Sequence, residues 1–316
     1  MRILFTSVGR RVELVEAFRA AADSLGKELV IYGADVSESA PALQFCDKTV
    51  IVPRIKDESY IPSLIDICKN EKIDALIPTI DTDLHLLSLH KGDFESVGTV
   101  AVISAPDKIA LCRDKRYTAD YFHSVGLKSP TPVDDVNAYD AGFPAFIKPK
   151  DGSSSINAYK VSSMEELISY ANQIPDYIIQ PFVTGTEYTV DAFCDFSGKP
   201  VFITPRIRLA VRAGEVLKTE ITNDRKIIDE MKVLIADYKP CGAITVQLIR
   251  EATTGDDYYI EINPRFGGGA PLSIKAGANS AEALLRLIDG ETLGYIDSAA
   301  ENGAVFSRFD QSVRVK

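Results

Sequence analysis

The sequence is poor in the residues that build metal clusters and disulfides. It holds three histidines and five cysteines in 316 residues, and the cysteines are scattered, odd in number and never arranged as Cys-x-x-Cys. This spacing argues against a zinc ribbon and against a disulfide framework, and it fits a reducing cytoplasm. The scarcity of histidine makes His-rich metal chemistry and a Ser-His-Asp arrangement poor candidates.

Long apolar runs and an excess of basic residues are also absent. No stretch approaches the roughly 20 apolar residues that a membrane-spanning helix needs, and the run Ile3-Leu4-Phe5 is too short for the core of a signal peptide. Lys and Arg total 35 against 45 Asp and Glu, which gives a net charge of −10. We predict a cytoplasmic protein that binds neither nucleic acid nor a membrane through its overall field, although one cleft could still be basic enough for phosphates.

Strand and helix patterns alternate over residues 1–104. The run at residues 3–5 is followed by apolar residues at helical spacing from Val12 to Leu25, with Gly26 as the stop signal. Alternation of strands and helices predicts a parallel sheet that is covered on both faces. The predicted strands lie at residues 3–5, 29–32, 49–52, 75–77 and 100–103.

From about residue 105 the pattern becomes mixed. A helix is predicted over residues 113–125, and two more around residues 227–235 and 281–288. At roughly 150 residues per domain, the length suits two domains. The last 25 or so residues carry no clear signal. Strands are predicted at residues 144–148, 158–161, 177–180, 187–193, 201–204, 243–250 and 258–263.

The last two strands form a hairpin that gathers oxygen-bearing side chains. If the hairpin closes symmetrically about Thr254, Gln247 lies opposite Glu261, and Glu261 shares a strand face with Asn263. Such hard oxygen ligands suit Mg²⁺, and Arg265 adds a forked cation for phosphate or carboxylate oxygens. A polar, solvent-facing strand would explain any one of these residues, but the combination, followed by the loop at residues 267–269, favours a site.

A second candidate is the strand that ends in Lys148. The loop after it contains Gly152, Ser153, Ser154 and Ser155, whose backbone N–H groups could wrap an anion. The lysine precedes the loop and no helix follows directly, so this is not a P-loop. A plain surface turn is the alternative interpretation.

A third candidate is the segment around residues 177–187. An apolar strand is interrupted by Pro181, as in an edge strand whose backbone groups could bind an adenine edge. Glu187 could accept hydrogen bonds from ribose hydroxyls. An ordinary edge strand explains the same pattern equally well.

Taken in order, these segments resemble the ATP-grasp superfamily, most closely one ATP-grasp half of the carbamoyl-phosphate synthase large subunit. The resemblance rests on Glu261-Ile262-Asn263-Pro264-Arg265 with the upstream Gln247, and the other segments support it. It implies a fold of the α/β and α+β classes: a Rossmann-like pre-ATP-grasp domain over residues 1–104, then a two-subdomain ATP-grasp fold. The ATP-grasp domain would cover residues 105–290, with a small lid subdomain at about 113–180 and a larger one at about 181–290. Residues 291–316 would form a C-terminal extension.

The resemblance also implies roles for single residues, with ATP and Mg²⁺ as cofactors and Mn²⁺ as a substitute. The sequence departs from the family where Gln180 replaces a frequent acidic residue and where the phosphate loop has fewer glycines. The expected roles are phosphate binding by Lys115, Lys148 and residues 152–155, adenine binding by Gln180 and the backbone of residues 179–182 including Phe182, ribose binding by Glu187, metal binding by Gln247, Glu261 and Asn263, and stabilisation of the transferred phosphoryl group by Arg265.

Further charged residues suggest a substrate pocket. Arg206 and Arg208 alternate onto one strand face, and with Arg212 they are candidates for a substrate carboxylate or the γ-phosphate; a solvated basic face is the alternative. Asp81 and Asp83 follow a parallel strand at its carboxyl end, where α/β sheets bind ligands. They could bind a substrate amine, or simply cap a helix.

We therefore predict an ATP-dependent ligase that phosphorylates a carboxylate to an acyl phosphate, which an amine or other nucleophile then captures. Its substrates would be small molecules, and a homo-oligomer is compatible with the sequence. One alternative is a carbamoyl-phosphate-synthase-like ATP-binding subunit that needs a partner chain. Another is a dinucleotide-dependent oxidoreductase that uses Asp35, although the first strand is not followed by Gly-x-Gly-x-x-Gly.

Overall fold

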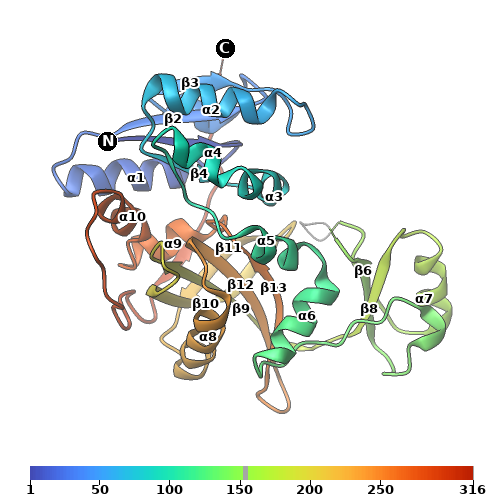
Figure 1. The fold of residues 1–316 in the computed structure, drawn as a ribbon. Helices are drawn as coiled ribbons and strands as arrows, with labels where there is room; N and C mark the ends of the chain where they lie inside the picture. Colours follow the sequence, from blue (N-terminus) through green and yellow to red (C-terminus); the bar gives the residue numbers. More distant parts are fainter. Residues whose placement is uncertain (152–155, 316) are drawn as a thin grey trace.

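The computed structural model describes residues 1–151 and 156–315, which form three sheets with their covering helices (Figure 1). The first sheet is five-stranded and parallel, in the order β3-β2-β1-β4-β5, as predicted. Ile3 and Phe5 of β1 lie in one hydrophobic core and Leu4 lies in another, so both faces are buried under helices. The elements are β1 (Arg2–Thr6), α1 (Val12–Ser24), β2 (Val30–Asp35), the 3₁₀ helix η1 (Pro41–Phe45), β3 (Lys48–Ile51), α2 (Tyr60–Glu71), β4 (Ala75–Pro78), α3 (Asp81–Leu89), α4 (Lys91–Ser96) and β5 (Val100–Ala101).

The second sheet has six strands in the order β13-β12-β9-β10-β11-β14, and all of its pairs are antiparallel. Its elements, with the helices around it, are α5 (Pro106–Arg113), α6 (Lys115–Ser124), β9 (Gly185–Cys194), β10 (Pro200–Arg212), β11 (Glu215–Ile221), α8 (Arg225–Tyr238), β12 (Gly242–Glu251), β13 (Asp257–Asn263), α9 (Ala270–Lys275), α10 (Ser280–Ile288) and β14 (Val305–Ser307).

The two faces of this sheet have different surroundings. Val190 and Ala192 of β9 pack into a core with α8 and with Phe122 of α6. On the opposite face Phe193 belongs to a core that also includes Phe18 of α1, and α9 and α10 pack against α1. One continuous apolar core therefore joins the first and second sheets. Asp191, between Val190 and Ala192, lies on the same face as Phe193 because strand side chains alternate.

The third sheet is small and stands out to one side of the molecule (Figure 1). Its strand order is β7-β6-β8, and it has its own hydrophobic core, to which Ile147, Leu167 and Ile179 belong. The helix α6, which the sequence analysis groups with this lid, instead packs against β13 of the large sheet. The elements of the small lobe are the 3₁₀ helix η2 (Val136–Ala138), β6 (Ala145–Pro149), β7 (Tyr159–Val161), α7 (Met164–Ala171) and β8 (Tyr177–Pro181).

Several elements differ from the sequence-based expectation. The helix expected at residues 113–125 is interrupted at Asp114, whose backbone is extended and whose side chain accepts from the Arg116 N–H as an N-cap. The strand expected at residues 201–204 runs on to Arg212, because it pairs with neighbours on both sides. The C-terminal segment supplies β14 to the sheet edge. Among the described residues, no helix has the length and apolar composition that crossing a membrane requires.

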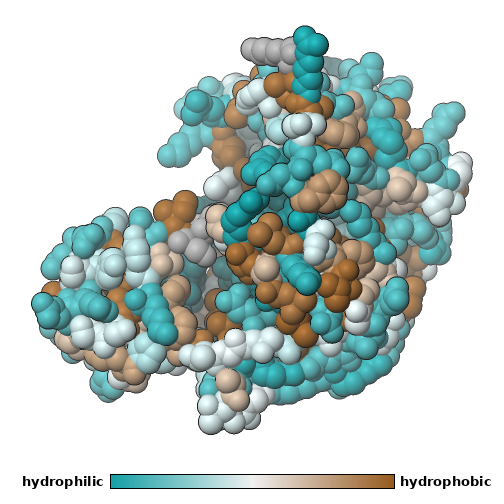
Figure 2. Space-filling model, turned by 180° about the vertical axis from the view of Figure 1, so that it is seen from behind, coloured by the Kyte–Doolittle hydropathy of each residue, from teal (hydrophilic) through white to brown (hydrophobic). Residues whose placement is uncertain are grey.

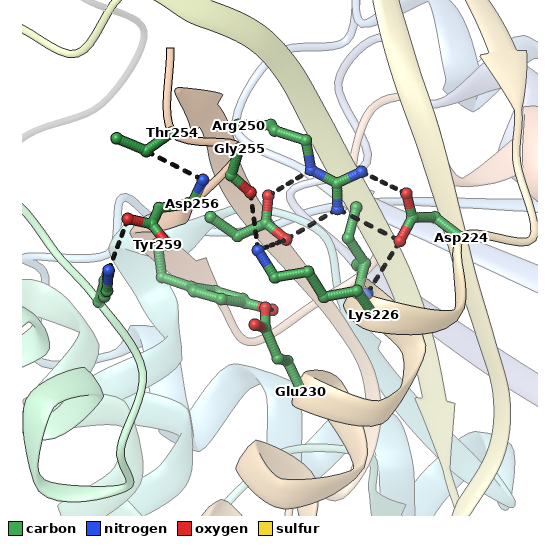
Figure 3. Close-up of polar contacts among 11 residues, drawn as sticks. Asp224, Lys226, Glu230, Arg250, Thr254, Gly255, Asp256 and Tyr259 are labelled. Atoms are coloured by element: carbon green, nitrogen blue, oxygen red, sulfur yellow. Dashed lines mark hydrogen bonds and ion pairs between the residues drawn. The ribbon is translucent and has the colours of Figure 1, made fainter. Parts of the chain in front are cut away.

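A network of charges fixes the far end of the β12–β13 hairpin to α8 (Figure 3). Arg250 donates to both oxygens of Asp257, at 2.7 and 2.8 Å, and also bonds Asp224 at the N-cap of α8. The Asp257 side chain is fully buried, and Lys226 forms a second ion pair with it at 3.2 Å. Two cations thus compensate a carboxylate that would be costly to bury alone.

We expect Asp257→Ala to lower the free energy of unfolding by about 3 kcal/mol, because it leaves two cations without their buried partner. The neighbouring Asp256 pairs with Lys128, whose side chain is 57% exposed, so Asp256→Ala should cost less than about 1 kcal/mol. Urea unfolding of the two variants measures both values. Equal, small losses in the two variants would contradict this account of the hairpin.

Candidate active site

A cavity of about 320 Å³ lies between the small sheet and the antiparallel sheet. Figure 2, which views the molecule from behind, shows the small lobe at the left and the hollow beside it. Phe146 and Ala158 line the cavity from the small sheet, and Tyr188 and Leu248 line it from the large one. Five of the predicted site residues also line it: Lys115, Lys148, Glu187, Gln247 and Glu261.

The hairpin strands form the polar floor of this cavity. Gln247 pairs with Glu261 in the sheet register, as predicted, and Asn263 Nδ2 donates to Glu261 Oε1 at 2.9 Å. The hairpin does not close symmetrically throughout, because the register shifts by one residue between Gln247 and Leu248. This bulge at Ile260 places Tyr259 in the core behind the sheet while Glu261 lines the cavity.

Two lysines face the floor across the cavity. Lys148 comes from β6 and is 8% exposed, and burial and the charge of Lys115 lower its pKa to about 8, although Glu261 acts in the opposite direction. Burial lowers the pKa of Lys115 as well, whereas Glu261, Asp151 and Asp114 raise it. The Lys115 N–H donates to the Lys150 carbonyl at 3.0 Å, which ties the start of α6 to the end of β6. Among the described carboxylates, Glu261 is the one that favours the charged form of Lys148, and Lys115 opposes it, so the ammonium group suits a bound anion.

We expect the affinity for MgATP to fall by about tenfold as pH rises from 7.5 to 9.5, because Lys148 loses its proton near pH 8 when no anion is bound. Lys148→Arg should bind with little dependence on pH over this range, since a guanidinium stays charged. Titration calorimetry at several pH values measures both affinities. A wild-type affinity that stays constant to pH 9.5 would exclude this role for Lys148.

Comparison with known proteins identifies the family of this chain. A family model of the ATP-grasp domain matches residues 112–269, and one of the PylC-like N-terminal domain matches residues 3–103. The chain belongs to the ATP-grasp family. The fold expected from the resemblance, with a parallel N-terminal sheet and an ATP-grasp domain, is therefore confirmed.

Its relatives among curated proteins include ligases and a synthase. D-alanine–D-alanine ligase of Bacillus anthracis is 28% identical over 151 residues, covering 41% of this chain and 50% of that protein. The N-terminal section of the carbamoyl phosphate synthase large chain of Aquifex aeolicus is 25% identical over 297 residues, covering 85% and 52%. 3-Methyl-D-ornithine–L-lysine ligase of Methanosarcina acetivorans is 25% identical over 278 residues, covering 86% and 70%.

The chain thus spans about half the length of the first curated relatives that it matches. Among solved structures, the biotin carboxylase of Campylobacter jejuni in complex with β,γ-ATP superposes with a TM-score of 0.76 at 16% identity, covering 96% of this chain and 74% of that one. At this identity the likeness concerns the fold.

The expected ATP-grasp lid contacts are only partly in place. Gln180 is buried, and its Nε2 donates to the Pro130 carbonyl at 2.6 Å, so the side chain braces the strand instead of facing the cavity. The Ile179 N–H and carbonyl are paired with Val133, so this part of the expected adenine-binding backbone is already bonded. Phe182 lies under Lys160 Nζ, at 4.3 Å. Residues Gly152, Ser153, Ser154 and Ser155 lie outside the described residues, although Asp151 and Ile156 on either side line the cavity.

The three arginines of β10 separate into different environments. Arg206 and Arg208 do share a face, and each pairs with a carboxylate of β9: Arg206 with Asp191 at 2.8 Å and Arg208 with Glu187 at 3.2 Å. Arg206 is 2% exposed and packs beneath the glycine loop, so it is held inside the protein. Arg208 lines the cavity instead.

Arg212 lies away from the cavity. Its side chain is 60% exposed and pairs with Asp310 in the C-terminal segment at 3.0 Å. Of the three arginines predicted to bind a substrate carboxylate or the γ-phosphate, the structure brings Arg208 to the cavity lining and leaves Arg206 and Arg212 away from it. The strand pattern alone could not separate the three, because all lie on one strand with no signal for the covering loops.

The N-terminal sheet contributes to the site through the turn after β4. Arg265 Nη2 bonds Asp81 Oδ2 at 2.5 Å, and Asn263 Oδ1 lies 3.4 Å from the same Nη2. Sequence reasoning missed two further residues here, Arg11 and Glu215, which both lie against Gly268. The pair Arg10-Arg11 soon after the first strand was a signal for Arg11, since the carboxyl end of a parallel strand is a usual place for ligand-binding groups. The sequence held no comparable signal for Glu215.

Asp83 has a structural environment. It is fully buried and accepts from Thr6 Oγ1, Ser7 Oγ and the Tyr60 hydroxyl at 3.1 to 3.2 Å, so it is closed to a substrate amine. Burial raises its pKa to about 6, although these hydrogen bonds act in the opposite direction.

Because folding raises the pKa of Asp83, its contribution favours the folded state at low pH and is lost as pH rises through about 6. We expect the free-energy difference between Asp83→Asn and the wild type to move in favour of the variant by about 2 kcal/mol from pH 4.5 to 7.5. Urea unfolding at the two pH values decides, and a pH-independent difference for Asp83→Asn would refute the shift.

Proposed function

We propose that this chain is an ATP-dependent ligase that phosphorylates a carboxylate to an acyl phosphate and transfers the acyl group to an amine or another nucleophile, releasing ADP and phosphate. One observation carries the proposal: Lys115, Lys148 and Glu261, from three separate elements, line a single cavity between the two lobes. Phosphoryl transfer depends mostly on positioning and charge neutralisation, and this arrangement supplies both.

The described residues fit MgATP. Two lysines with lowered pKa values line the same cavity as the carboxylate of Glu261, and a triphosphate with a divalent cation complements this arrangement. Glu261, Gln247 and Asn263 would hold Mg²⁺, which would neutralise the phosphate oxygens when bound. The described parts of the chain contain no group of three or more His, Cys, Asp or Glu side chains placed to hold a metal ion by themselves. A Mg²⁺ ion that shares its ligands with phosphates needs no such cage.

The remaining roles follow from position. Lys148 and Lys115 would hold the phosphates, Glu187 would accept hydrogen bonds from the ribose, and Arg265, two residues beyond Asn263, would stabilise the transferred phosphoryl group. Arg208 also lines the cavity, and its partner Glu187 keeps a side chain that is 54% exposed. Arg208 would therefore bind the substrate carboxylate or the γ-phosphate.

A finer reading is a carbamoyl-phosphate-synthase-like enzyme that acts on bicarbonate, alone or with a partner chain. The similarity to the carbamoyl phosphate synthase section over 85% of the chain supports it, while the similarity to amino-acid ligases supports other carboxylates. Family membership favours ATP over a dinucleotide as the cofactor. Self-assembly, a partner chain and a cytoplasmic location stay predictions.

The test is release of ADP with and without Mg²⁺ and a panel of carboxylates, with hydroxylamine to trap the acyl phosphate. We expect Glu261→Gln and Lys148→Ala to lower carboxylate-dependent ADP release by roughly 100-fold or more, because each removes a charge that the transition state needs. Asp256→Asn and Lys128→Ala, an exposed pair on the same lobe, serve as matched controls and should leave the rate unchanged. Full turnover by Glu261→Gln, or ADP release independent of every carboxylate, would refute the proposal.

A further inference from the structure

A second polar cluster lies where the parallel sheet meets the glycine loop at residues 267–269. Its members are Asp81, from the turn after β4, Arg265 and Arg11, which follows β1, and Glu215, which begins β11. A Cβ on Gly268 would come within 2.5 Å of Glu215 Oε2 and 2.8 Å of Arg11 Nη1, so these two charged groups meet over the loop. Arg11 also donates to the Thr79 carbonyl at 3.3 Å.

The pair between Asp81 and Arg265 is incompletely satisfied. Asp81 Oδ1 and Arg265 Nε are both buried, and neither has a hydrogen-bond partner among the described residues. A buried polar atom without a partner costs roughly 1–3 kcal/mol, so a ligand that bonded both groups would improve on the present arrangement. The site is also reachable, since 32% of the Asp81 side chain is exposed.

Other contacts already hold the two sheets together without such cost. Lys27 pairs with Asp289, and Lys275 pairs with Glu13 at 3.0 Å, in both cases between the N-terminal part and the ATP-grasp part. The shared apolar core adds to them. The Asp81–Arg265 pair is therefore not needed to hold the two sheets together.

The charges of the cluster specify its ligand. Glu215 is shared with Arg308 at 3.3 Å, whereas Asp81 Oδ1 lacks a donor and Arg265 Nε lacks an acceptor among the described residues. A ligand that carries both a cationic donor and an anionic acceptor would satisfy these two atoms. An α-amino acid carries its ammonium and carboxylate groups on one carbon, and it can replace the internal ion pair by two external ones. A plain carboxylate such as bicarbonate would bring a second negative charge next to Asp81.

We propose that the cluster of Asp81, Arg265 and Arg11 is a binding site for an α-amino acid, which bonds Asp81 through its ammonium group and the two arginines through its carboxylate. This proposal rests on the proposed function, because it names the class of carboxylate that the ligase activates. Asp81 is then the residue that selects amino acids over simple acids.

The change of ion-pair partners also connects the amino acid to the residues of β13 that are proposed to hold Mg²⁺. Glu261, Asn263 and Arg265 are linked in series by the contacts at 2.9 and 3.4 Å, and Asp81 ends the series. When the ammonium group takes Asp81, Arg265 is released towards the carboxylate that is to be phosphorylated. Without an amino acid, Arg265 stays bound to Asp81, and ATP is not spent on water.

The test compares each of the common L- and D-amino acids with the acid that lacks its amino group, for example alanine with propionate. Two measurements are made: the thermal midpoint of the MgADP-loaded protein, and ADP release from MgATP. We expect at least one amino acid to raise the midpoint and to be preferred over its deaminated acid by roughly 100-fold in kcat/KM. Asp81→Asn should lower that preference at least tenfold, mainly by raising KM for the amino acid.

The matched control is Asp289→Asn, which also removes an ion pair between the N-terminal part and the ATP-grasp part but lies outside the cluster. This variant should keep the wild-type preference for the amino acid over its deaminated acid. A merely structural role for Asp81 would lower the rates with both acids equally and leave their ratio unchanged, which would overturn the proposal.

Two further results would also overturn it: deaminated acids or bicarbonate that shift the midpoint as much as amino acids do, or no shift with any amino acid. Failure of the proposed function gives a different result. In that case amino acids bind to the MgADP-loaded protein in an Asp81-dependent manner, but no carboxylate stimulates ADP release.

Discussion

The two ammonium groups of Lys115 and Lys148, which line one cleft, are the feature on which the rest of the site depends. Lys148 is almost fully buried and Lys115 stands close enough to lower its pKa. Glu261 is the carboxylate that acts on both. Burying charge is costly unless a partner compensates it, so the buried ammonium group of Lys148 suits an anion that arrives from solution. Membership in the ATP-grasp family gives that anion its identity.

The fold holds these charges in place by local means. A backbone bond from Lys115 to Lys150 fixes the start of α6 against the end of β6, although the helix packs on one lobe and the strand belongs to the other. On the floor, the bulge at Ile260 turns Glu261 towards the cleft while Tyr259 fills the core behind it. The same hairpin is fastened at its far end by the buried Asp257, so the floor is anchored beyond the cavity.

The site also extends across the boundary between the parallel and antiparallel sheets. A series of polar contacts leads from Glu261 through Asn263 and Arg265 to Asp81. Asp81 and its neighbour Asp83 look alike in the sequence, but Asp81 is partly exposed and pairs with Arg265, whereas Asp83 is fully buried under three hydroxyl groups. Both residues lie in α3, where side chains two residues apart point in nearly opposite directions.

The sequence by itself determined the features that depend on short-range periodicity. Alternating apolar runs defined the parallel sheet, because strand and helix periods are visible over a few residues. The predicted pairing of Gln247 with Glu261 is present, but it depends on the bulge at Ile260, which no local pattern predicted. Tertiary structure alone decided which of Arg206, Arg208 and Arg212 reaches the cavity, that Gln180 braces its strand, and that Arg11 and Glu215 meet over Gly268. Those outcomes depend on which distant segment covers each side chain, and no local pattern along one chain encodes that.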